Sequence, residues 1–255
     1  MNYDKSEFEL TQINNNLSHR KTEYFLEEND LELCQAFKNI EKEMRLGFIR
    51  KVYGILIAQL AVTTIMCTFS MTSQSWAEFQ QNNLWLMWFS LIITLTSMIV
   101  LVCVPGFVRK VPANYIVTGV FTICEGYLVS LICATTDPSV VFMAAFMTCA
   151  MTCALSVYAC KTKTDFTVYN SLLFLALSCL FLLGLFTLFT QNSFLNVLYC
   201  SLGVFIYSIY LIIDTQMIIE SGKYAYETDD YLLAAINLYL DIINLFIYIL
   251  RIFKK

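Results

Sequence analysis

The chain has 255 residues, of which 58% are hydrophobic and only 14% are charged, with a net charge of −4. This composition excludes an ordinary soluble domain of that length and indicates an integral membrane protein. The acidity is concentrated in residues 1–47, which hold ten acidic and six basic side chains, whereas the remainder is electrically balanced. Because nothing in the sequence resembles a basic surface that could bind nucleic acid, we expect no nucleic-acid partner.

Residues 1–47 are expected to form a cytoplasmic acidic tail. Within this tail, Leu33, Phe37, Ile40 and Met44 recur at positions i, i+4, i+7 and i+11 between charged residues. This spacing predicts an amphipathic helix that lies at the membrane interface.

Residues 48–255 are expected to form a seven-helix transmembrane domain. About 20 apolar residues are needed to cross roughly 30 Å of hydrocarbon. Segments of at least this length lie at 52–77, 79–108, 115–136, 139–160, 166–213 and 232–253, and the fifth is long enough for two spans with a break at 190–194. The fold class is therefore an all-α polytopic membrane protein.

The loop charges predict the orientation of these spans. Alternate loops carry Arg45, Arg50, Lys51, Arg109, Lys110, Lys161, Lys163 and Lys223. The turns at 71–83, 135–138 and 190–193 carry no Lys or Arg, so the positive-inside rule predicts a cytoplasmic amino terminus. A last segment that enters and returns would keep the basic carboxyl terminus on the same side. We favour a complete seventh span, because this segment has no Gly or Pro break.

Three acidic residues interrupt the apolar spans: Glu125, Asp214 and Asp241. Each charged group at the centre of a helix costs at least roughly 2.5–3.5 kcal/mol on insertion scales. We therefore expect these acids to face the interior of the bundle, where they are paired, protonated or bound to a cation. The simplest interpretation is that each acid is neutralised and only fixes helix packing.

Asp214 and Asp241 lie on consecutive helices joined by a short connection, so they can meet in the core. Two carboxylates in contact cannot cheaply both ionise, so the pair would share a proton and respond to pH. Beside a water-filled path, the same oxygens would suit Ca²⁺. Asn237 and Asn244 extend the polar stripe of Asp241, and Arg109 is a candidate basic partner whose alternative role is an anchor at the membrane surface.

Enzymatic alternatives fit the sequence poorly. Two intramembrane aspartates are also typical of aspartyl intramembrane proteases, but the GxGD and Pro-Ala-Leu motifs of that class do not occur. A zinc hydrolase needs several histidines, whereas the chain has only His19, and its ten cysteines are scattered singly. We expect no enzymatic activity and no cofactor. A seven-helix receptor stays formally open, although the outer turns are short.

Four segments together resemble the transmembrane Bax-inhibitor-motif family, in its Lifeguard or Golgi anti-apoptotic branch. They are "FIRKVYGILIAQLAVT" (48–63), "CKTKTDFT" (160–167), "IYLIIDTQMII" (209–219) and "DYLLAAINLYLDIINLFIYILR" (230–251). The resemblance runs from Phe48 to the carboxyl terminus. It implies a seven-helix fold in which the last helix is enclosed by the other six.

The resemblance also implies a function, namely a pH-sensitive Ca²⁺ leak of endoplasmic reticulum or Golgi membranes that lowers stored Ca²⁺ and opposes apoptosis. It pairs Asp214 with Asp241 as pH-sensing residues and candidate Ca²⁺ ligands, and "FTICEGYLVS" places Glu125 on the acidic residue of the family's third span. In a bacterial relative an arginine of the second span is tied to the aspartate pair, which makes Arg109 the candidate here.

The partners implied by the resemblance are the lipid bilayer, Ca²⁺, and Bax/Bcl-type apoptosis regulators or Ca²⁺-release channels. The alternative is a non-conducting membrane interaction protein, whose acidic tail recruits partners that control cell death or stress signalling.

Overall fold

A computed structural model describes residues 3–103, 111–162, 164–190, 192–220, 226–227 and 229–254, and at 3–32 and 102 it describes only the backbone. The chain divides into two compact units, residues 1–47 and 48–255. Helix α1 (Tyr3–Thr72) begins in the first unit and ends in the second. In the first unit, the apolar stripe formed by Leu33, Phe37, Ile40 and Met44 is exposed, and its position at a membrane interface stays a prediction.

Seven helical segments of the described chain are long and apolar enough to cross a membrane, which confirms the predicted number of spans. They are the end of α1, α3 (Leu84–Cys103), α5 (Ala113–Ala134), α6 (Pro138–Lys161), η1 (Thr167–Tyr169) with α7 (Asn170–Thr190), α8 (Ser193–Ile219) and α9 (Tyr231–Phe253). Long uninterrupted apolar segments form helices because the hydrocarbon offers no partner for an unpaired backbone group. The all-α fold class is therefore confirmed.

A short helix, α2 (Gln74–Asn82), occupies what the sequence predicts only as a polar turn. Its Gln80 is fully buried. Ser70 Oγ donates a hydrogen bond to Gln80 Oε1 at 2.9 Å, and Gln80 Nε2 donates to Ser130 Oγ at 3.0 Å. Both ends of the Gln80 amide are thus satisfied, which fixes α2 to α1 and α5 without an unpaired polar group.

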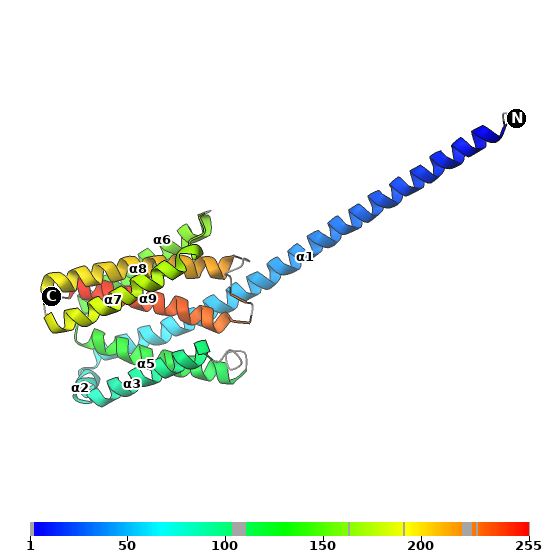
Figure 1. The fold of residues 1–255 in the computed structure, drawn as a ribbon. Coiled ribbons are helices and arrows are strands. Elements are labelled where there is room, and N and C mark those ends of the chain that lie inside the picture. The colour runs from blue at the N-terminus through cyan, green and yellow to red at the C-terminus, as the bar shows by residue number, and fades with distance from the viewer. Residues whose placement is uncertain are drawn as a thin grey trace. The chain divides into compact units, whose positions relative to one another are not determined.

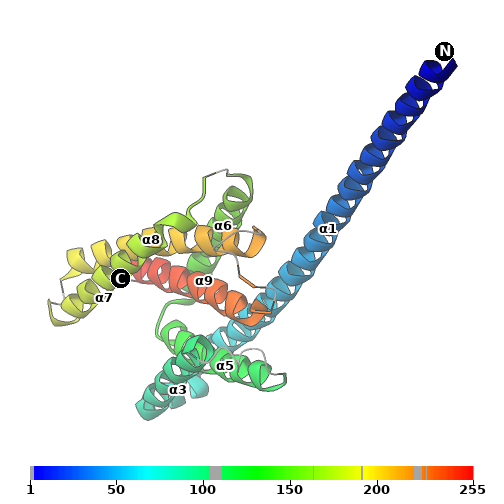
Figure 2. The same ribbon diagram turned by 45° about the vertical axis from the view of Figure 1, so that its right-hand side comes forward.

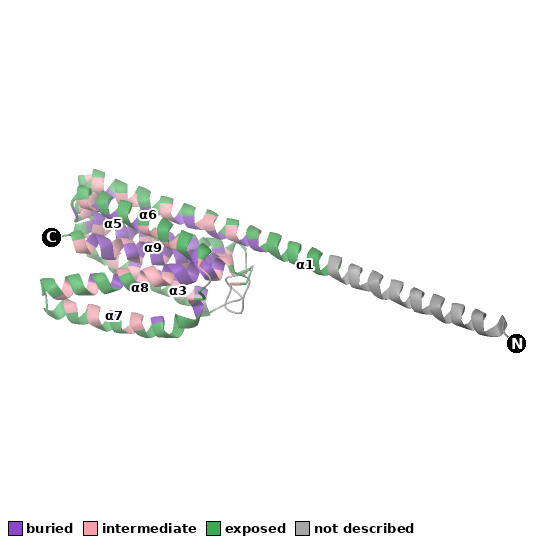
Figure 3. Cartoon of the chain, turned by 90° about the horizontal axis from the view of Figure 1, so that it is seen from above, coloured by how far each residue is buried: buried purple, intermediate pink, exposed green. Residues whose placement is uncertain are grey.

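Helix α9 forms the centre of the bundle. It packs most extensively on α8 and also contacts α5 and α6, while α3 lies against α5 (Figures 1 and 2). Thirteen of its 23 residues are buried, and Figure 3 shows this burial along its length. Lys254 Nζ donates to Thr135 Oγ1, at 3.1 Å, in the turn that joins α5 to α6. The last helix is therefore enclosed and crosses the whole bundle, as predicted.

A close approach between α8 and α9 depends on a glycine. A Cβ atom added to Gly203 would lie 2.6 Å from Cδ1 of the Tyr248 ring. The Tyr248 hydroxyl is hydrogen-bonded to that of Tyr199 at 3.0 Å, and its ring packs on Tyr207 with centroids 5.6 Å apart. The absence of a side chain at Gly203 therefore lets the ring lie directly on the backbone of α8.

Candidate functional site: a buried aspartate pair

The two aspartates of the last two helices meet, as the sequence predicts. The side chains of Asp214 on α8 and Asp241 on α9 lie within hydrogen-bonding reach of each other. Both residues are more than nine-tenths buried, with exposed fractions of 9% and 6%. Oδ2 of Asp241 is buried and receives no hydrogen bond from the residues that the structure describes.

This contact determines which protonation states are accessible. Two carboxylates in contact in a low-dielectric interior repel strongly, so both cannot be ionised cheaply. A proton held by one group can be donated to the other, which forms a hydrogen bond between the two side chains. The pair therefore behaves as a single site whose protons are gained and lost in coupled steps.

A cavity of about 460 Å³ lies beside the pair, between α7, α8, α9 and the connection from α8 to α9. Its wall is mostly polar or aromatic and includes both acids. The lining residues are Asn170, Leu177, Tyr207, Tyr210, Asp214, Met217, Tyr226, Asn237, Leu240, Asp241 and Asn244.

Both asparagines predicted from the sequence line this cavity. Asn237 Nδ2 donates to the Tyr226 hydroxyl at 2.8 Å, whereas Asn244 Nδ2 donates to the carbonyl oxygen of Leu240 at 2.8 Å. Tyr226 lies outside the spans, and its backbone N–H donates to the Met217 carbonyl at 3.3 Å. Burial, reinforced by the nearby Asp214, raises the pKa of Tyr226, so its hydroxyl keeps its proton at neutral pH.

The connection between α6 and α7 docks beside the acid pair. Gln216, two residues after Asp214, donates from Nε2 to the Thr164 carbonyl at 2.9 Å and accepts at Oε1 from the Phe166 N–H at 3.0 Å. This double contact fixes residues 164–166 against α8 and thereby brings the start of α7, with Asn170, to the cavity wall. Sequence reasoning missed the role of Gln216, although its motif was singled out.

Glu125 is not brought to the aspartate pair, and it does not line the cavity around it. Its carboxyl group lies within electrostatic range of the Tyr239 hydroxyl. At about 100° per residue, Tyr239 is on the opposite side of α9 from Asp241, and its hydroxyl is hydrogen-bonded to Thr63 Oγ1 at 2.7 Å. Glu125 therefore lies nearer to the hydrogen bond between Thr63 and Tyr239 than to the cavity around the aspartate pair.

Arg109 lies outside the described residues, so its link to the aspartate pair stays a prediction.

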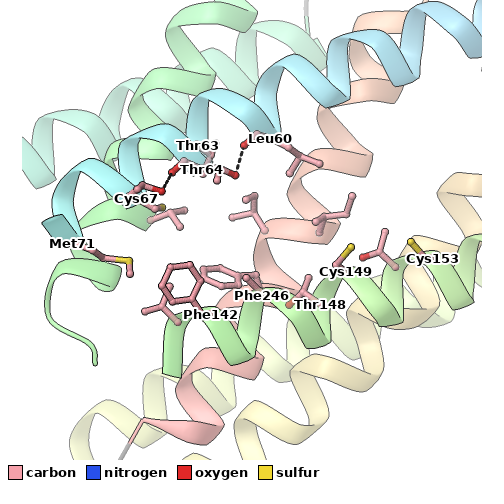
Figure 4. Close-up of a pocket in the computed structure, with 17 residues that line it drawn as sticks. Leu60, Thr63, Thr64, Cys67, Met71, Phe142, Thr148, Cys149, Cys153 and Phe246 are labelled. Atoms are coloured by element: carbon pink, nitrogen blue, oxygen red, sulfur yellow. Dashed lines mark hydrogen bonds between the residues drawn. The ribbon is translucent and has the colours of Figure 1, made fainter. Parts of the chain in front are cut away.

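A second cavity, of about 320 Å³, lies between α1, α6 and α9 (Figure 4). Four of its five threonine hydroxyls donate within their own helices, whereas Oγ1 of the fifth, Thr152, is buried and has no hydrogen-bond partner among the described residues. Thr63 donates to the Gln59 carbonyl, Thr64 to the Leu60 carbonyl, and Thr148 to the Ala144 carbonyl. The remaining lining is chiefly apolar, so this second cavity offers little to an ion.

The donor set around the aspartate pair limits how a metal ion could bind. Within the described parts of the chain, no cluster of three or more His, Cys, Asp or Glu side chains comes together. Ca²⁺ takes six to eight oxygen ligands, so at Asp214 and Asp241 it would keep most of its water. The two carboxyl groups therefore supply only part of the coordination that a resident Ca²⁺ would need.

The fold and the site define a class, namely polytopic membrane proteins in which a central last helix carries an acid that meets the acid of the preceding helix. Residues 45–255 match the family described as inhibitor of apoptosis-promoting Bax1. The chain is 34% identical over 221 residues to Protein LIFEGUARD 4 of Arabidopsis thaliana, which covers 83% of this chain and 86% of that protein. It is 26% identical over 216 residues to Protein lifeguard 3 of Homo sapiens, covering 83% and 70%.

The chain therefore belongs to the Bax inhibitor family, with Lifeguard proteins among its relatives, which confirms the predicted resemblance. The role attached to this family is inhibition of apoptosis.

Proposed function

We propose that the chain is a pH-sensitive Ca²⁺ leak channel of the endoplasmic reticulum or Golgi, with a cytoplasmic amino terminus, that lowers stored Ca²⁺ and thereby opposes apoptosis. The observation that carries this proposal is the contact between Asp214 and Asp241 on the wall of a cavity. The family membership supports the anti-apoptotic outcome.

The mechanism follows from the proton that the pair shares. With one proton, a hydrogen bond holds α8 to α9 at this point. Loss of that proton replaces the bond with repulsion between two negative charges, which favours separation of the two carboxyl groups and attracts cations to the cavity. The equilibrium between closed and open arrangements of the last two helices is thus coupled to pH.

The test is Ca²⁺ efflux from liposomes that contain the purified protein, measured across pH. The variants are Asp214→Asn and Asp241→Asn, and the matched control is Glu125→Gln, an acid of the spans that does not line the cavity. We expect each aspartate variant to lose the pH dependence of the efflux while the control keeps it. Absence of efflux at every pH from folded protein would overturn the proposal.

The exposed apolar stripe of the first unit favours a second candidate function. Leu33, Phe37, Ile40 and Met44 are each more than half exposed, on one face of α1, and such a face can bind a membrane surface or a partner helix. A non-conducting protein that recruits regulators of cell death or stress signalling through this tail would lose its cellular effect when residues 1–47 are deleted. Full protection from apoptosis after the deletion would remove this candidate.

A further inference from the structure

The cavity around the aspartate pair is much larger than a metal ion requires. Its volume of about 460 Å³ lies within the range of roughly 300–1,000 Å³ that is typical of small-molecule pockets. A water molecule takes up about 30 Å³ in the liquid. The size of the cavity therefore suits an organic ligand, and all the side chains of its wall, not only the two acids, determine which ligand fits.

The acidic part of the wall calls for a charged hydrogen-bond donor. When Asp214 and Asp241 share one proton they carry one net negative charge, and both side chains line the cavity as hydrogen-bond acceptors. An N–H group on a cation satisfies both the charge and the acceptor, and such charge-assisted hydrogen bonds are about twice as strong as neutral ones.

The aromatic part of the wall favours an ammonium group. The rings of Tyr207 and Tyr210 both line the cavity, with centroids 6.1 Å apart and planes inclined at 42°. Ring faces attract an ammonium group within about 6 Å, with a gain of roughly 0.5–2 kcal/mol that grows as water is excluded.

The remaining part of the wall is apolar. Leu177, Met217 and Leu240 line the same cavity, and they offer a surface to an alkyl chain. A hydrated metal ion would leave this surface and the tyrosine rings uncovered, whereas a quaternary ammonium ion would have no N–H for Asp241.

We propose that this cavity binds a protonated primary alkylamine, with its ammonium group at the Asp241 carboxyl and the Tyr207 and Tyr210 rings and its chain on Leu177, Met217 and Leu240. This inference rests on the proposed function, because the ligand would occupy the cavity through which Ca²⁺ is proposed to pass. Its test is nevertheless a binding measurement that needs no ion flux, so the two can fail separately.

The probe is n-butylammonium chloride at pH 7, where an alkylamine is protonated. Binding to the purified full-length protein in detergent is measured by saturation-transfer NMR and by the rise in the midpoint of thermal unfolding, Tm. We expect saturable binding and a higher Tm, whereas n-butanol, an uncharged molecule of the same length, should give neither. Equal effects of the two compounds would overturn the proposal, because they would show that the cavity binds the butyl chain and does not recognise the ammonium group.

The variants assign the contacts. Tyr210→Leu should weaken n-butylammonium binding by about twofold to thirtyfold, the range that corresponds to loss of one cation–π contact. The matched control Tyr158→Leu, on the exposed surface of α6, should bind as the native chain does.

The double variant Asp214→Asn/Asp241→Asn should abolish saturable binding, because it removes both carboxyl groups of the pair, and the Tm without ligand shows whether the variant is folded. Unchanged binding in a folded Asn variant, or equal binding by Tyr210→Leu and Tyr158→Leu, would refute the assignment.

Discussion

The substitution Gly203→Ala tests whether the close approach of α8 and α9 is as tight as the structure shows. Its Cβ would lie 2.6 Å from Cδ1 and 2.7 Å from Cε1 and Cγ of Tyr248, about 1 Å inside the optimum of roughly 3.5–4.0 Å between carbon atoms. Overpacking of this kind costs about 1–3 kcal/mol. A displaced ring would also lose the hydrogen bond to Tyr199, worth about 1 kcal/mol.

We therefore expect Gly203→Ala to lower the free energy of unfolding by about 2–4 kcal/mol. The assay is reversible unfolding in mixed micelles, followed by circular dichroism. The matched control is Gly119→Ala, because a Cβ there would meet no atom within 4 Å; this variant should be neutral or more stable by up to about 1 kcal/mol.

A second comparison isolates the clash with the ring. In a Tyr248→Leu background the cost of Gly203→Ala should shrink, because the ring carbons that the new methyl group would meet are gone. If Gly203→Ala were as stable as Gly119→Ala, or if its cost were the same in both backgrounds, the reasoning would be wrong.

Two further predictions concern the cavity wall. Gln216→Ala should free the connection between α6 and α7, because the Phe166 amide would lose the acceptor to which it donates. We expect this amide to exchange its hydrogen at least tenfold faster, which is equivalent to about 1.4 kcal/mol. Unchanged exchange would show that Gln216 does not hold this segment. Tyr226→Phe should lower the free energy of unfolding by about 1–2 kcal/mol, because Asn237 Nδ2 loses its acceptor, whereas Tyr169→Phe on the exposed surface should be neutral. Equal stability of the two variants would contradict a stabilising hydrogen bond between Asn237 and Tyr226.

The features that the sequence predicts well are those determined by the lipid bilayer. The length of an apolar segment fixes the number of spans, because the thickness of the hydrocarbon is constant. The free-energy cost of placing a charge in lipid similarly predicts that Asp214 and Asp241 face inward. Because a short connection joins their two helices, the two side chains can meet in the interior. These inferences need no knowledge of how each helix is rotated.

The features that sequence misses depend on helix rotation and on partners far apart in the chain. Gln80 bonds to Ser130, 50 residues away, and Tyr239 to Thr63, 176 residues away. No local pattern encodes such pairs, because each exists only once two helices have a defined register. Glu125 illustrates the same point, since its burial is predictable from its charge but its position opposite the aspartate pair is not.

The uneven burial of the helices has a consequence for what each position must specify. Thirteen of the 23 residues of α9 are buried, against two of the 21 in α7. Most positions of α7 need only be apolar enough to dissolve in lipid, and many side chains meet that requirement. More than half of the positions of α9 must also match their neighbours in shape, so two helices of similar composition differ in how strongly each position is constrained.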